Sequence, residues 1–359
     1  MPARIAVIGT GWWSTYAHIP SLVQYPEAEL VAIADPDRER LDAAGDAYDV
    51  VRRYTSYEEM LDSERLDGVV VATPHTTHFG IAQAVLSRGL GLMLEKPMVL
   101  RAPEARALHA LAAERKVPLV IGYPYHFVPQ HRLLRERIAA GALGQLQLVN
   151  NLFASMVLEY YRANPLAYEP VFKWPVTGPR STTYSDPSQA GGGQGHLQVT
   201  HSAALLLWLT GLQPESVAAF MANFDVRVDL CDAISVRFVE GAVGTLASTG
   251  GIPAAQSAHQ QLEYRLYGSG GYALLDTMAG SCAIHYNDGR VETLDPTPPD
   301  RLYDPGSTSR HLADLLDGRA EENLSDGTIG VRTVELLDAA YRSAAAGRVV
   351  RVDELANDA

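Results

Sequence analysis

The first third of the chain alternates between short apolar runs and stretches with helical periodicity. The apolar runs are residues 4–8, 30–34, 68–72, 92–94 and 118–122, and the helical stretches are residues 14–25, 39–48, 57–61, 81–88 and 103–115. Strands that are hydrophobic throughout are covered on both faces, and their alternation with helices is typical of a parallel sheet. We therefore predict a doubly wound α/β domain over residues 1–123.

The pattern changes in the second part of the chain. Apolar and polar positions alternate in runs separated mostly by glycine turns, which indicates strands with one buried face and one solvated or partner-covered face. An apolar helix from about Gln194 to residue 209 and an amphipathic helix at 327–345 complete the pattern. This predicts an α+β domain over residues 124–359 with a large, mainly antiparallel open sheet. The alternating runs are residues 145–153, 216–223, 233–239, 243–250, 261–268 and 272–276.

Residues 159–188 show little periodicity and are rich in proline and tyrosine. A long stretch of this kind inside a compact domain is usually functional, as a lid or a substrate wall. Tyr160 and Trp174 offer aromatic surface that can stack on a sugar ring. The alternative is that these rings only hold the segment onto the protein.

Length, charge and cysteine content narrow the class of protein. A chain of 359 residues fits two domains, and its formal charge of -13 with a pI near 5.3 argues against nucleic acid or an anionic membrane as partner. No apolar stretch is long enough to span a bilayer, and the N-terminus runs into an apolar strand without a secretory signal. Cys231 and Cys282 lie far apart without neighbouring ligands, so we expect no disulfide framework, no metal site and a cytoplasmic location.

The first apolar run leads into a glycine turn, Gly9-Thr10-Gly11. In a strand-turn-helix unit the first glycine permits the tight turn, and the second lets a pyrophosphate approach the backbone. A plain turn is the alternative interpretation. Trp12 and Trp13 follow the turn and are assigned to the same cofactor site.

Asp35 ends the second apolar run, at about the position where an acidic residue holds the ribose hydroxyls of NAD. A carboxylate repels the 2′-phosphate of NADP, which favours NAD, although Arg38 nearby makes NADP possible. The alternative is that Asp35 only begins the turn that it forms with Pro36.

Two further strand exits carry candidate residues. The third apolar run ends at Thr73-Pro74-His75, and because strand exits face the cofactor in such a sheet, we expect these residues and His78 to lie close to it. Each histidine is equally compatible with a solvated loop or a helix cap. The fourth run ends at Glu95-Lys96, which places a lysine at the ligand crevice, with a solvated ion pair as the alternative.

In this order and spacing, these motifs resemble the Gfo/Idh/MocA family of NAD(P)-dependent oxidoreductases. The resemblance rests on Gly9-Thr10-Gly11, Asp35, residues 73–78, Glu95-Lys96-Pro97 and Gly122-Tyr123. It implies a Rossmann first domain, a sugar, polyol or inositol substrate, and a second-domain sheet that forms the interface of a homodimer or homotetramer. It also assigns Lys96 to catalysis beside the nicotinamide.

Two positions depart from the family pattern. His126 stands where the family has an arginine, so we assign it to the cofactor site with Tyr125 on the substrate side. After the glycine run 191–193, His201 matches the family's catalytic histidine, but Leu197 replaces its aspartate. On a helix, Gln194, Gln198 and His201 share one face, where they can bind a hydroxyl-rich ligand. The alternative is that His201 is a satisfied core residue.

Together these observations predict a cytoplasmic dehydrogenase. His201 accepts the hydroxyl proton and Lys96 polarises the same oxygen while hydride moves between NAD(P) and a carbon of a sugar, glycoside, inositol or polyol. Two alternatives stay open: an NAD-dependent glycosidase of the same fold that works by transient oxidation, and a non-catalytic NAD-binding regulator.

Overall fold

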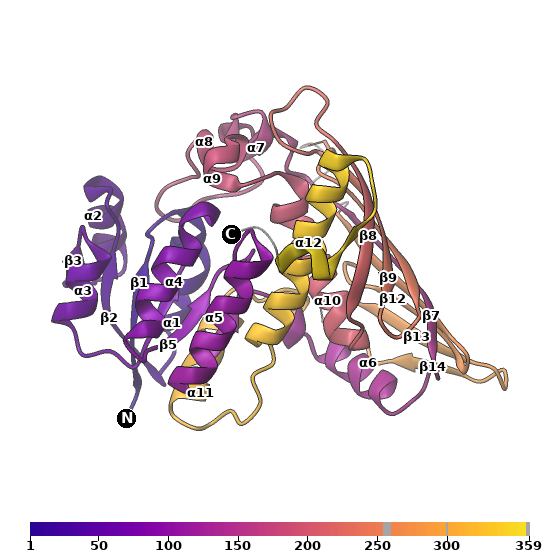
Figure 1. Ribbon diagram of the computed structural model, residues 1–359. Coiled ribbons are helices and arrows are strands. Elements are labelled where there is room, and N and C mark those ends of the chain that lie inside the picture. The colour runs from indigo at the N-terminus through magenta and orange to yellow at the C-terminus, as the bar shows by residue number, and fades with distance from the viewer. Residues whose placement is uncertain (254–259, 299–300, 357–359) are drawn as a thin grey trace.

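The computed structural model describes residues 1–253, 260–298 and 301–356. Its first sheet is parallel and six-stranded, in the order β3-β2-β1-β4-β5-β6, so the strand order reverses beside β1 (Figure 1). This confirms the predicted doubly wound sheet, whose ligand crevice lies at the strand carboxyl ends near that reversal. The strands are β1 (Ala3–Ile8), β2 (Ala28–Ala34), β3 (Arg53–Tyr54), β4 (Gly68–Val71), β5 (Gly91–Leu94) and β6 (Leu119–Ile121).

Helices cover both faces of this sheet because successive strand side chains point in opposite directions. In β1, Ile5 and Val7 belong to the core under one group of helices, and Ala6 and Ile8 belong to the core under the other. The first group is α1 (Ile19–Val23), α2 (Arg38–Ala47) and α11 (Ser307–Leu316), and the second is α3 (Tyr57–Ser63), α4 (His78–Ser87) and α5 (Ala102–Arg115). Since α11 comes after all but the last strand of the second sheet in sequence, the C-terminal part of the chain returns to the first sheet.

The second sheet has nine strands in the order β14-β13-β12-β11-β7-β10-β9-β8-β15. Among the described strands only the pair β7 and β10 is parallel, so the sheet is mainly antiparallel as predicted. Three of its strands, β13, β14 and the short β15, were not predicted. The strands are β7 (Leu146–Ala154), β8 (Pro214–Ala222), β9 (Cys231–Phe238), β10 (Val243–Thr249), β11 (Gln261–Gly268), β12 (Gly271–Asp276), β13 (Ser281–Tyr286), β14 (Val291–Leu294) and β15 (Val350–Arg351).

Three helices pack on one face of this sheet (Figure 1). The central one, α10 (Thr200–Thr210), is hydrophobic all round, and its residues 203–209 are buried on every side. It is flanked by α6 (Pro129–Ala139), which was not predicted, and by α12 (Gly327–Ala346). Because α12 also packs against α5, it ties the two halves of the molecule together.

Residues 158–190, hereafter the 158–190 segment, join β7 to the helix before α10. The segment is built from single turns rather than open loop: α7 (Leu158–Tyr161), a 3-10 turn (Pro165–Tyr168), α8 (Thr182–Ser185) and α9 (Pro187–Ala190). Figure 1 shows these turns at the top of the molecule, between the helices of the first sheet and the strands of the second. Within the described residues, no helix is both long and apolar enough to cross a bilayer.

Candidate active site

A cavity of about 1250 Å3 lies between the carboxyl edge of the first sheet and the 158–190 segment. Its volume exceeds the ~300–1000 Å3 of an ordinary small-molecule site, as expected for a space that takes a dinucleotide and a substrate together. Both domains supply its walls. Most of the residues predicted as site residues line it: Gly9, Gly11, Trp12, Trp13, Asp35, Thr73, Pro74, His75, Glu95, Lys96, Tyr125, Tyr160, Gln198 and His201.

The glycine turn fits a pyrophosphate. Gly9 has a φ of +95°, and a Cβ on it would lie 2.3 Å from the carbonyl oxygen of Ala72, so only glycine allows the turn to pass β4. A Cβ on Gly11 would meet nothing within 4 Å, because this residue faces the open cavity. The backbone at Gly11 can therefore be approached closely by a phosphate group. A π-helical turn follows at Ser14–His18, with the buried hydroxyl of Ser14 left without a partner in the described chain.

Asp35 lines the cavity at the end of β2. Its carboxylate accepts hydrogen bonds from the backbone N–H of Thr10 at 2.8 Å and of Asp37 at 2.9 Å, which fixes it beside the glycine turn. Arg38, by contrast, pairs with Asp42 at 2.8 Å on the outer side of α2, and the structure places it outside the cavity. The reason is helical geometry: Asp37 caps α2, and Arg38 begins it facing solvent.

The arginines that do line this end of the cavity are Arg40 and Arg180. Arg180 comes from the 158–190 segment and forms an ion pair with Asp37, while Arg40 lies 3.7 Å from the same carboxylate. Arg40 also donates to the carbonyl of Gly178 at 3.1 Å. Sequence reasoning missed both, since Arg180 is brought here only by the tertiary fold.

The two histidines at the exit of β4 have different surroundings. His75 lines the cavity, and its Nδ1 lies 2.9 Å from the carbonyl oxygen of Ala190 in α9. His78 is fully buried, with ring nitrogens 2.8 and 3.0 Å from the carbonyl oxygens of Pro97 and Thr73. The structure therefore places His78 behind the wall, where it links the two strand exits instead of contacting a ligand.

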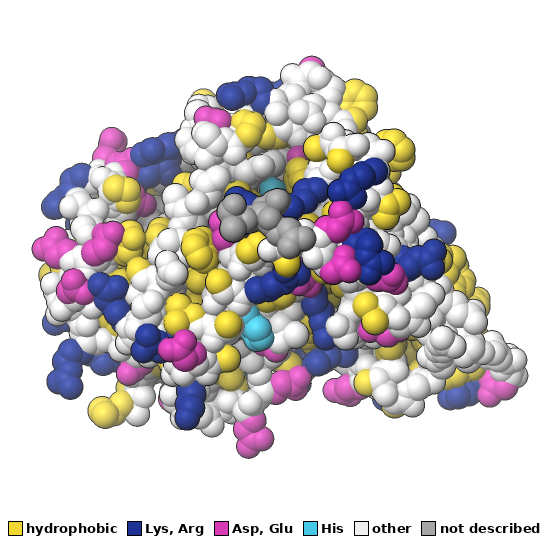
Figure 2. Space-filling view, viewed as in Figure 1, with side chains coloured by type: hydrophobic (Ala, Val, Ile, Leu, Met, Phe, Trp, Pro, Cys, Tyr) yellow, Lys and Arg dark blue, Asp and Glu magenta, His cyan; other side chains and the backbone are white. Residues whose placement is uncertain are grey.

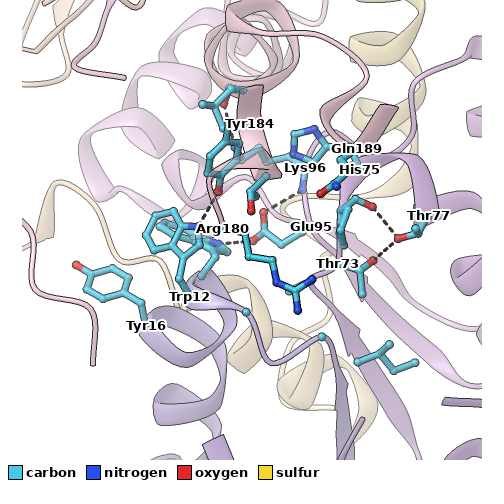
Figure 3. Close-up of a pocket in the computed structure, with 18 of the residues that line it drawn as sticks. Trp12, Tyr16, Thr73, His75, Thr77, Glu95, Lys96, Arg180, Tyr184 and Gln189 are labelled. Atoms are coloured by element: carbon cyan, nitrogen blue, oxygen red, sulfur yellow. Dashed lines mark hydrogen bonds between the residues drawn. The ribbon is translucent and has the colours of Figure 1, made fainter. Parts of the chain in front are cut away.

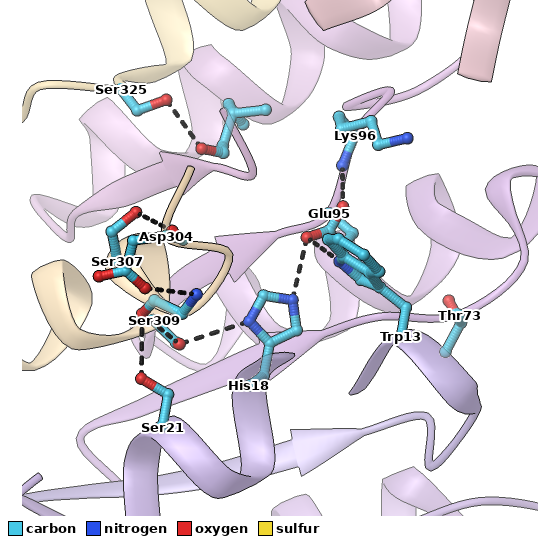
Figure 4. Close-up of polar contacts among 12 residues, drawn as sticks. Trp13, His18, Ser21, Thr73, Glu95, Lys96, Asp304, Ser307, Ser309 and Ser325 are labelled. Carbon is cyan, nitrogen blue, oxygen red and sulfur yellow. Dashed lines mark hydrogen bonds and ion pairs between the residues drawn. The ribbon is translucent and has the colours of Figure 1, made fainter. Parts of the chain in front are cut away.

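Glu95 is held by three groups that converge on its carboxylate (Figure 4). The indole N–H of Trp13 donates to Oε1 at 2.9 Å, the Nε2 of His18 lies 2.9 Å from the same oxygen, and the N–H of Lys96 donates to Oε2 at 3.0 Å. Burial acts to raise the pKa of Glu95, but His18, Lys96 and Trp13 together lower it below its usual value. Glu95 is thus an ionised anchor, and Gly122 is required beside it because a Cβ there would lie 2.8 Å from Oε1.

The side chain of Lys96 crosses from the first domain to the second. Its Nζ donates to the carbonyl oxygen of Leu197 at 2.9 Å, in the residue that replaces the family aspartate. Burial lowers the pKa of Lys96 to about 8, although the charge of Glu95 opposes the shift. The ammonium group therefore exchanges its proton close to neutral pH, which suits a group acting on an alcohol or a ketone.

His201 lines the same cavity as Lys96 and is buried against the ring of Tyr125, with centroids 5.9 Å apart. Its Nδ1 has no hydrogen-bond partner within the described part of the chain. Burial, with the charges of Lys96 and His126, holds the pKa of His201 well below its usual value. His201 is therefore neutral at neutral pH and able to accept a proton.

A π-helical turn, Gly195–Val199, precedes α10 and changes which side chains face the cavity. The wider turn shifts the register away from 3.6 residues per turn, so the predicted shared face is only partly formed. Gln198 and His201 line the cavity, but Gln194 is fully buried behind it. Its amide bonds to the hydroxyls of Tyr161, Ser155 and Ser248.

The glycine run before this turn is held by Asp229, which sequence reasoning missed. The Asp229 carboxylate accepts the N–H groups of Gly193 and Gly195, each at 2.7 Å, and the hydroxyl of Tyr341 at 2.9 Å. A Cβ on Gly193 would lie 2.1 Å from the carbonyl oxygen of Asp229, so the run must be glycine to approach this loop. Nothing in the sequence marks Asp229, because its partners are distant along the chain.

Aromatic rings form the wall opposite Lys96. Trp12 donates through its indole N–H to the hydroxyl of Tyr184 at 2.9 Å (Figure 3). Tyr160 and Phe172 pack around Trp12. Trp174 lies outside the cavity lining and packs on Phe172, so it supports the wall without forming it.

His126 also lies outside the cavity. Its ring is fully buried and stacks on Trp208 of α10, with centroids 4.8 Å apart. The backbone turns into a 3-10 helix at Pro124–Phe127, which directs Tyr125 to the cavity and His126 away from it. The structure therefore does not support the cofactor contact predicted for His126.

Comparison with known families agrees with this arrangement. Residues 3–123 match the model of the oxidoreductase family with an NAD-binding Rossmann fold, GFO_IDH_MocA, and residues 131–274 match the GFO/IDH/MocA C-terminal domain. This chain belongs to the Gfo/Idh/MocA family. Its first domain is the family's NAD-binding Rossmann fold, so the cofactor is NAD, with NADP possible. The glycine turn, Asp35 and the exit of β4 line the cavity.

Several known proteins are similar to this chain at moderate identity. The rhizopine catabolism protein MocA of Rhizobium meliloti is 31% identical over 212 residues, 59% of this chain and 58% of that protein, so the match spans a little over half of its length. D-xylose 1-dehydrogenase (NADP(+)) 2 of Haloferax volcanii is 26% identical over 97% of this chain and 99% of its own. Among solved structures, GenD2 from gentamicin A biosynthesis in complex with NAD has a TM-score of 0.78 and 26% identity, covering 98% of this chain and 96% of that chain.

Proposed function

We propose that this protein is an NAD(P)-dependent dehydrogenase that acts on a secondary alcohol, or the corresponding ketone, of a sugar, glycoside, inositol or polyol. The observation that carries the proposal is the meeting of Lys96 and His201 in one cavity with the dinucleotide-binding turn. The names of two relatives, D-xylose 1-dehydrogenase and D-apiose dehydrogenase, support a carbohydrate substrate.

In the oxidative direction the substrate hydroxyl lies against both catalytic side chains. The ammonium group of Lys96 donates to the reacting oxygen and stabilises the negative charge that develops there, and neutral His201 accepts the hydroxyl proton. The bound nicotinamide supplies the hydride acceptor. The carbonyl of Leu197 holds the Nζ of Lys96 at the boundary between the domains. This carbonyl takes over the orienting role that a carboxylate would have at this position.

NAD is the preferred cofactor in this proposal. The Asp35 carboxylate is fixed by two backbone N–H groups and can accept ribose hydroxyls. Arg40 and Arg180 lie close to it, but both are paired with Asp37. The 2′-phosphate of NADP can pair with these arginines only if it displaces the Asp37 carboxylate. NADP therefore binds more weakly than NAD.

The test is formation of NADH, followed by absorbance, while the protein with NAD or NADP is screened against sugars, inositols, polyols and glycosides. Lys96→Ala should lower kcat by about 10²–10³-fold, the usual cost of removing one donor to a developing oxyanion. The control is Lys116→Asn, because Lys116 is exposed, far from the cavity and in a left-handed conformation that asparagine tolerates.

Turnover that is lost in Lys96→Ala and retained in Lys116→Asn supports the proposal. NAD binding without turnover of any compound would refute it, and would leave the redox-neutral glycosidase or the non-catalytic regulator. An assay for hydrolysis of a glycoside distinguishes these two alternatives, because only the glycosidase performs that reaction.

We further propose that the protein is a cytoplasmic homo-oligomer that associates through the outer face of the second sheet. Paired residues place an apolar and aromatic row across six strands on this face. In order, the row is Val243, Leu148, Tyr267, Tyr272, His285 and Val291, hereafter the sheet row. Figure 2 shows hydrophobic side chains along the flank where these strands run. Isolated large hydrophobic residues on a surface are common, but a continuous row marks an interface.

A further inference from the structure

The charged side chains of the cavity are distributed unevenly. Asp35, Asp37, Arg40, Glu58 and Arg180 all belong to the adenosine end, around the end of β2 and the start of α3. At the catalytic end, the charged residues of the described lining are Glu95 and Lys96, which follow β5.

Neither of these two is available to pair with a charge on the substrate. The Glu95 carboxylate is already bonded by His18, Trp13 and the N–H of Lys96. Lys96 is the group that acts on the reacting oxygen. A phosphate or carboxylate on the substrate would lose its hydration without gaining an ionic partner, which disfavours its binding. The catalytic end therefore fits a neutral molecule.

The wall opposite Lys96 offers mainly aromatic ring surface. The indole N–H groups of Trp12 and Trp13 are both used inside the protein, by Tyr184 and Glu95. What these two side chains present to the cavity is therefore aromatic surface alone. The rings of Tyr16 and Phe172 extend the wall, with centroids 4.9 Å apart.

The remaining substrate-side lining is also mainly apolar. It is contributed by the strand and turn before α7, by residues 277–303 and by the π-helical turn: Phe153, Met156, Val157, Leu197, Met278 and Tyr303. Gln198 and His201 share this end with Lys96, and the cavity lining also includes the uncharged polar side chains of Gln189 and Gln260. These groups can bond hydroxyls next to the reacting carbon, whereas the side chains of Phe153, Met156, Val157 and Met278 offer no hydrogen bonds.

We propose that the substrate is a neutral glycoside with an aromatic aglycone: its sugar ring is held at Lys96, Gln198 and His201, and its aglycone is stacked on the wall formed by Trp12, Tyr16 and Phe172. This rests on the proposed dehydrogenase function and names its substrate class. Aromatic pairs with ring centroids about 4.5–7 Å apart attract each other beyond their burial of area, so an aryl group gains more from this wall than an alkyl group does. The volume of the cavity, about 1250 Å3, leaves room for a substrate larger than a monosaccharide beside the cofactor.

The experiment compares one sugar in four forms with the NAD-loaded protein: free, as the methyl glycoside, as the phenyl glycoside and as the 6-phosphate. We expect kcat/KM to rise about tenfold from methyl to phenyl glycoside, and the phosphate to be inert. In Phe172→Ala the ratio of phenyl to methyl kcat/KM should fall to near one. Tyr16→Ala should lower the same ratio. Because Tyr16 belongs to the first domain, its effect cannot come from a local folding defect in the 158–190 segment.

The matched control is Leu166→Ala, because Leu166 is in the same segment but is 68% exposed and outside the cavity. Equal kcat/KM for phenyl and methyl glycosides, or a preference for the phosphate, would overturn the proposed substrate class while leaving the dehydrogenase intact. If no compound is oxidised, the dehydrogenase fails. Binding of the phenyl and methyl glycosides is then measured by quenching of tryptophan fluorescence. Tighter binding of the phenyl glycoside still supports the proposed ligand class, and equal binding of the two overturns it.

Discussion

The properties of Lys96 follow from its position at a domain boundary. Burial lowers its pKa to about 8, and Glu95 prevents a larger fall. Oxidation of the alcohol needs the protonated lysine, because the ammonium group must donate to the oxygen as it gains charge. The fraction of protonated lysine decreases as pH rises through its pKa, whereas His201 stays in its neutral, proton-accepting form, so the oxidation rate decreases with the lysine.

We therefore expect kcat/KM for alcohol oxidation to be level near neutral pH and to fall about tenfold per pH unit above pH 8. In Lys96→Arg the guanidinium keeps its proton, with a pKa above about 12, so this alkaline limb should vanish even though the rate is lower. The pH profiles of the two proteins provide the measurement. An alkaline limb at the same pH in Lys96→Arg would assign the titration to another group.

Asp229 positions the catalytic helix without touching the cavity. Its neighbour Asp232 has a pKa raised to about 9 by burial and by the charge of Asp229, so the pair carries one negative charge beneath the glycine run. In Asp229→Asn an amide N–H₂ replaces one acceptor oxygen, which leaves the N–H of Gly193 or Gly195 without a partner. We expect the free energy of unfolding to fall by about 1–3 kcal/mol.

The same variant should lower kcat, because Leu197 and His201 follow directly from the glycine run, while NAD binding is retained. Thermal unfolding and steady-state kinetics measure the two effects. The matched control is Asp225→Asn, which removes an exposed ion pair with Arg162 and should change the free energy of unfolding by no more than about 1 kcal/mol. A kcat equal to that of the unchanged protein would show that Asp229 has no positioning role.

At the scale of elements, the sequence predicted what depends on local pattern. The parallel sheet, the alternating strands and the amphipathic α12 follow from periodicity, and the strand exits placed Asp35 and Lys96 at the cavity. It did not predict the two π-helical turns, Ser14–His18 and Gly195–Val199, since an insertion in a helix has no clear hydrophobic signature. The second of these turns is the reason that Gln194 is buried behind the cavity wall.

The 158–190 segment shows the same limit. Its role as a wall was expected from its length and aromatic content, but its contacts with the first domain depend on tertiary pairing. His75 bonds to Ala190, Trp12 to Tyr184 and Arg40 to Gly178, and Arg180 pairs with Asp37. These contacts close the cavity at both its catalytic and its adenosine end.

Loss of the Arg180 contact should weaken the binding of the cofactor. The side chain of Arg180 is 57% exposed, so its ion pair contributes little to stability, and we expect Arg180→Ala to raise the dissociation constant of NADH only about two- to fivefold. High salt screens the pair and should remove the difference between the two proteins. NADH fluorescence titrations at low and high salt test this. Arg162→Ala is the control, since Arg162 pairs within its own domain with Glu159 and Asp225.

At the scale of the whole molecule, the two sheets serve different purposes. The first is covered by helices on both faces, whereas the helices of the described residues cover only one face of the second. Its other face carries the sheet row, in which the rings of Tyr267, Tyr272 and His285 stack at 5.6 and 4.4 Å. Leu148 lies near one end of this row, between Val243 and Tyr267, and is 38% exposed in the single chain.

A second copy of the chain can cover this row with its own, because an interface with two-fold symmetry uses the same patch on both partners. A carboxylate placed at Leu148 would be buried unpaired in both copies at once, which costs far more than its exposure in a monomer. We expect Leu148→Asp to convert a dimer or tetramer into smaller species in sedimentation velocity, with NAD binding retained. Val239→Asp should leave the assembly unchanged, because Val239 is more exposed, at 62%, but lies in a turn outside the row. If the unchanged protein is monomeric at micromolar concentration, the row is not a subunit interface, and its apolar character needs another explanation.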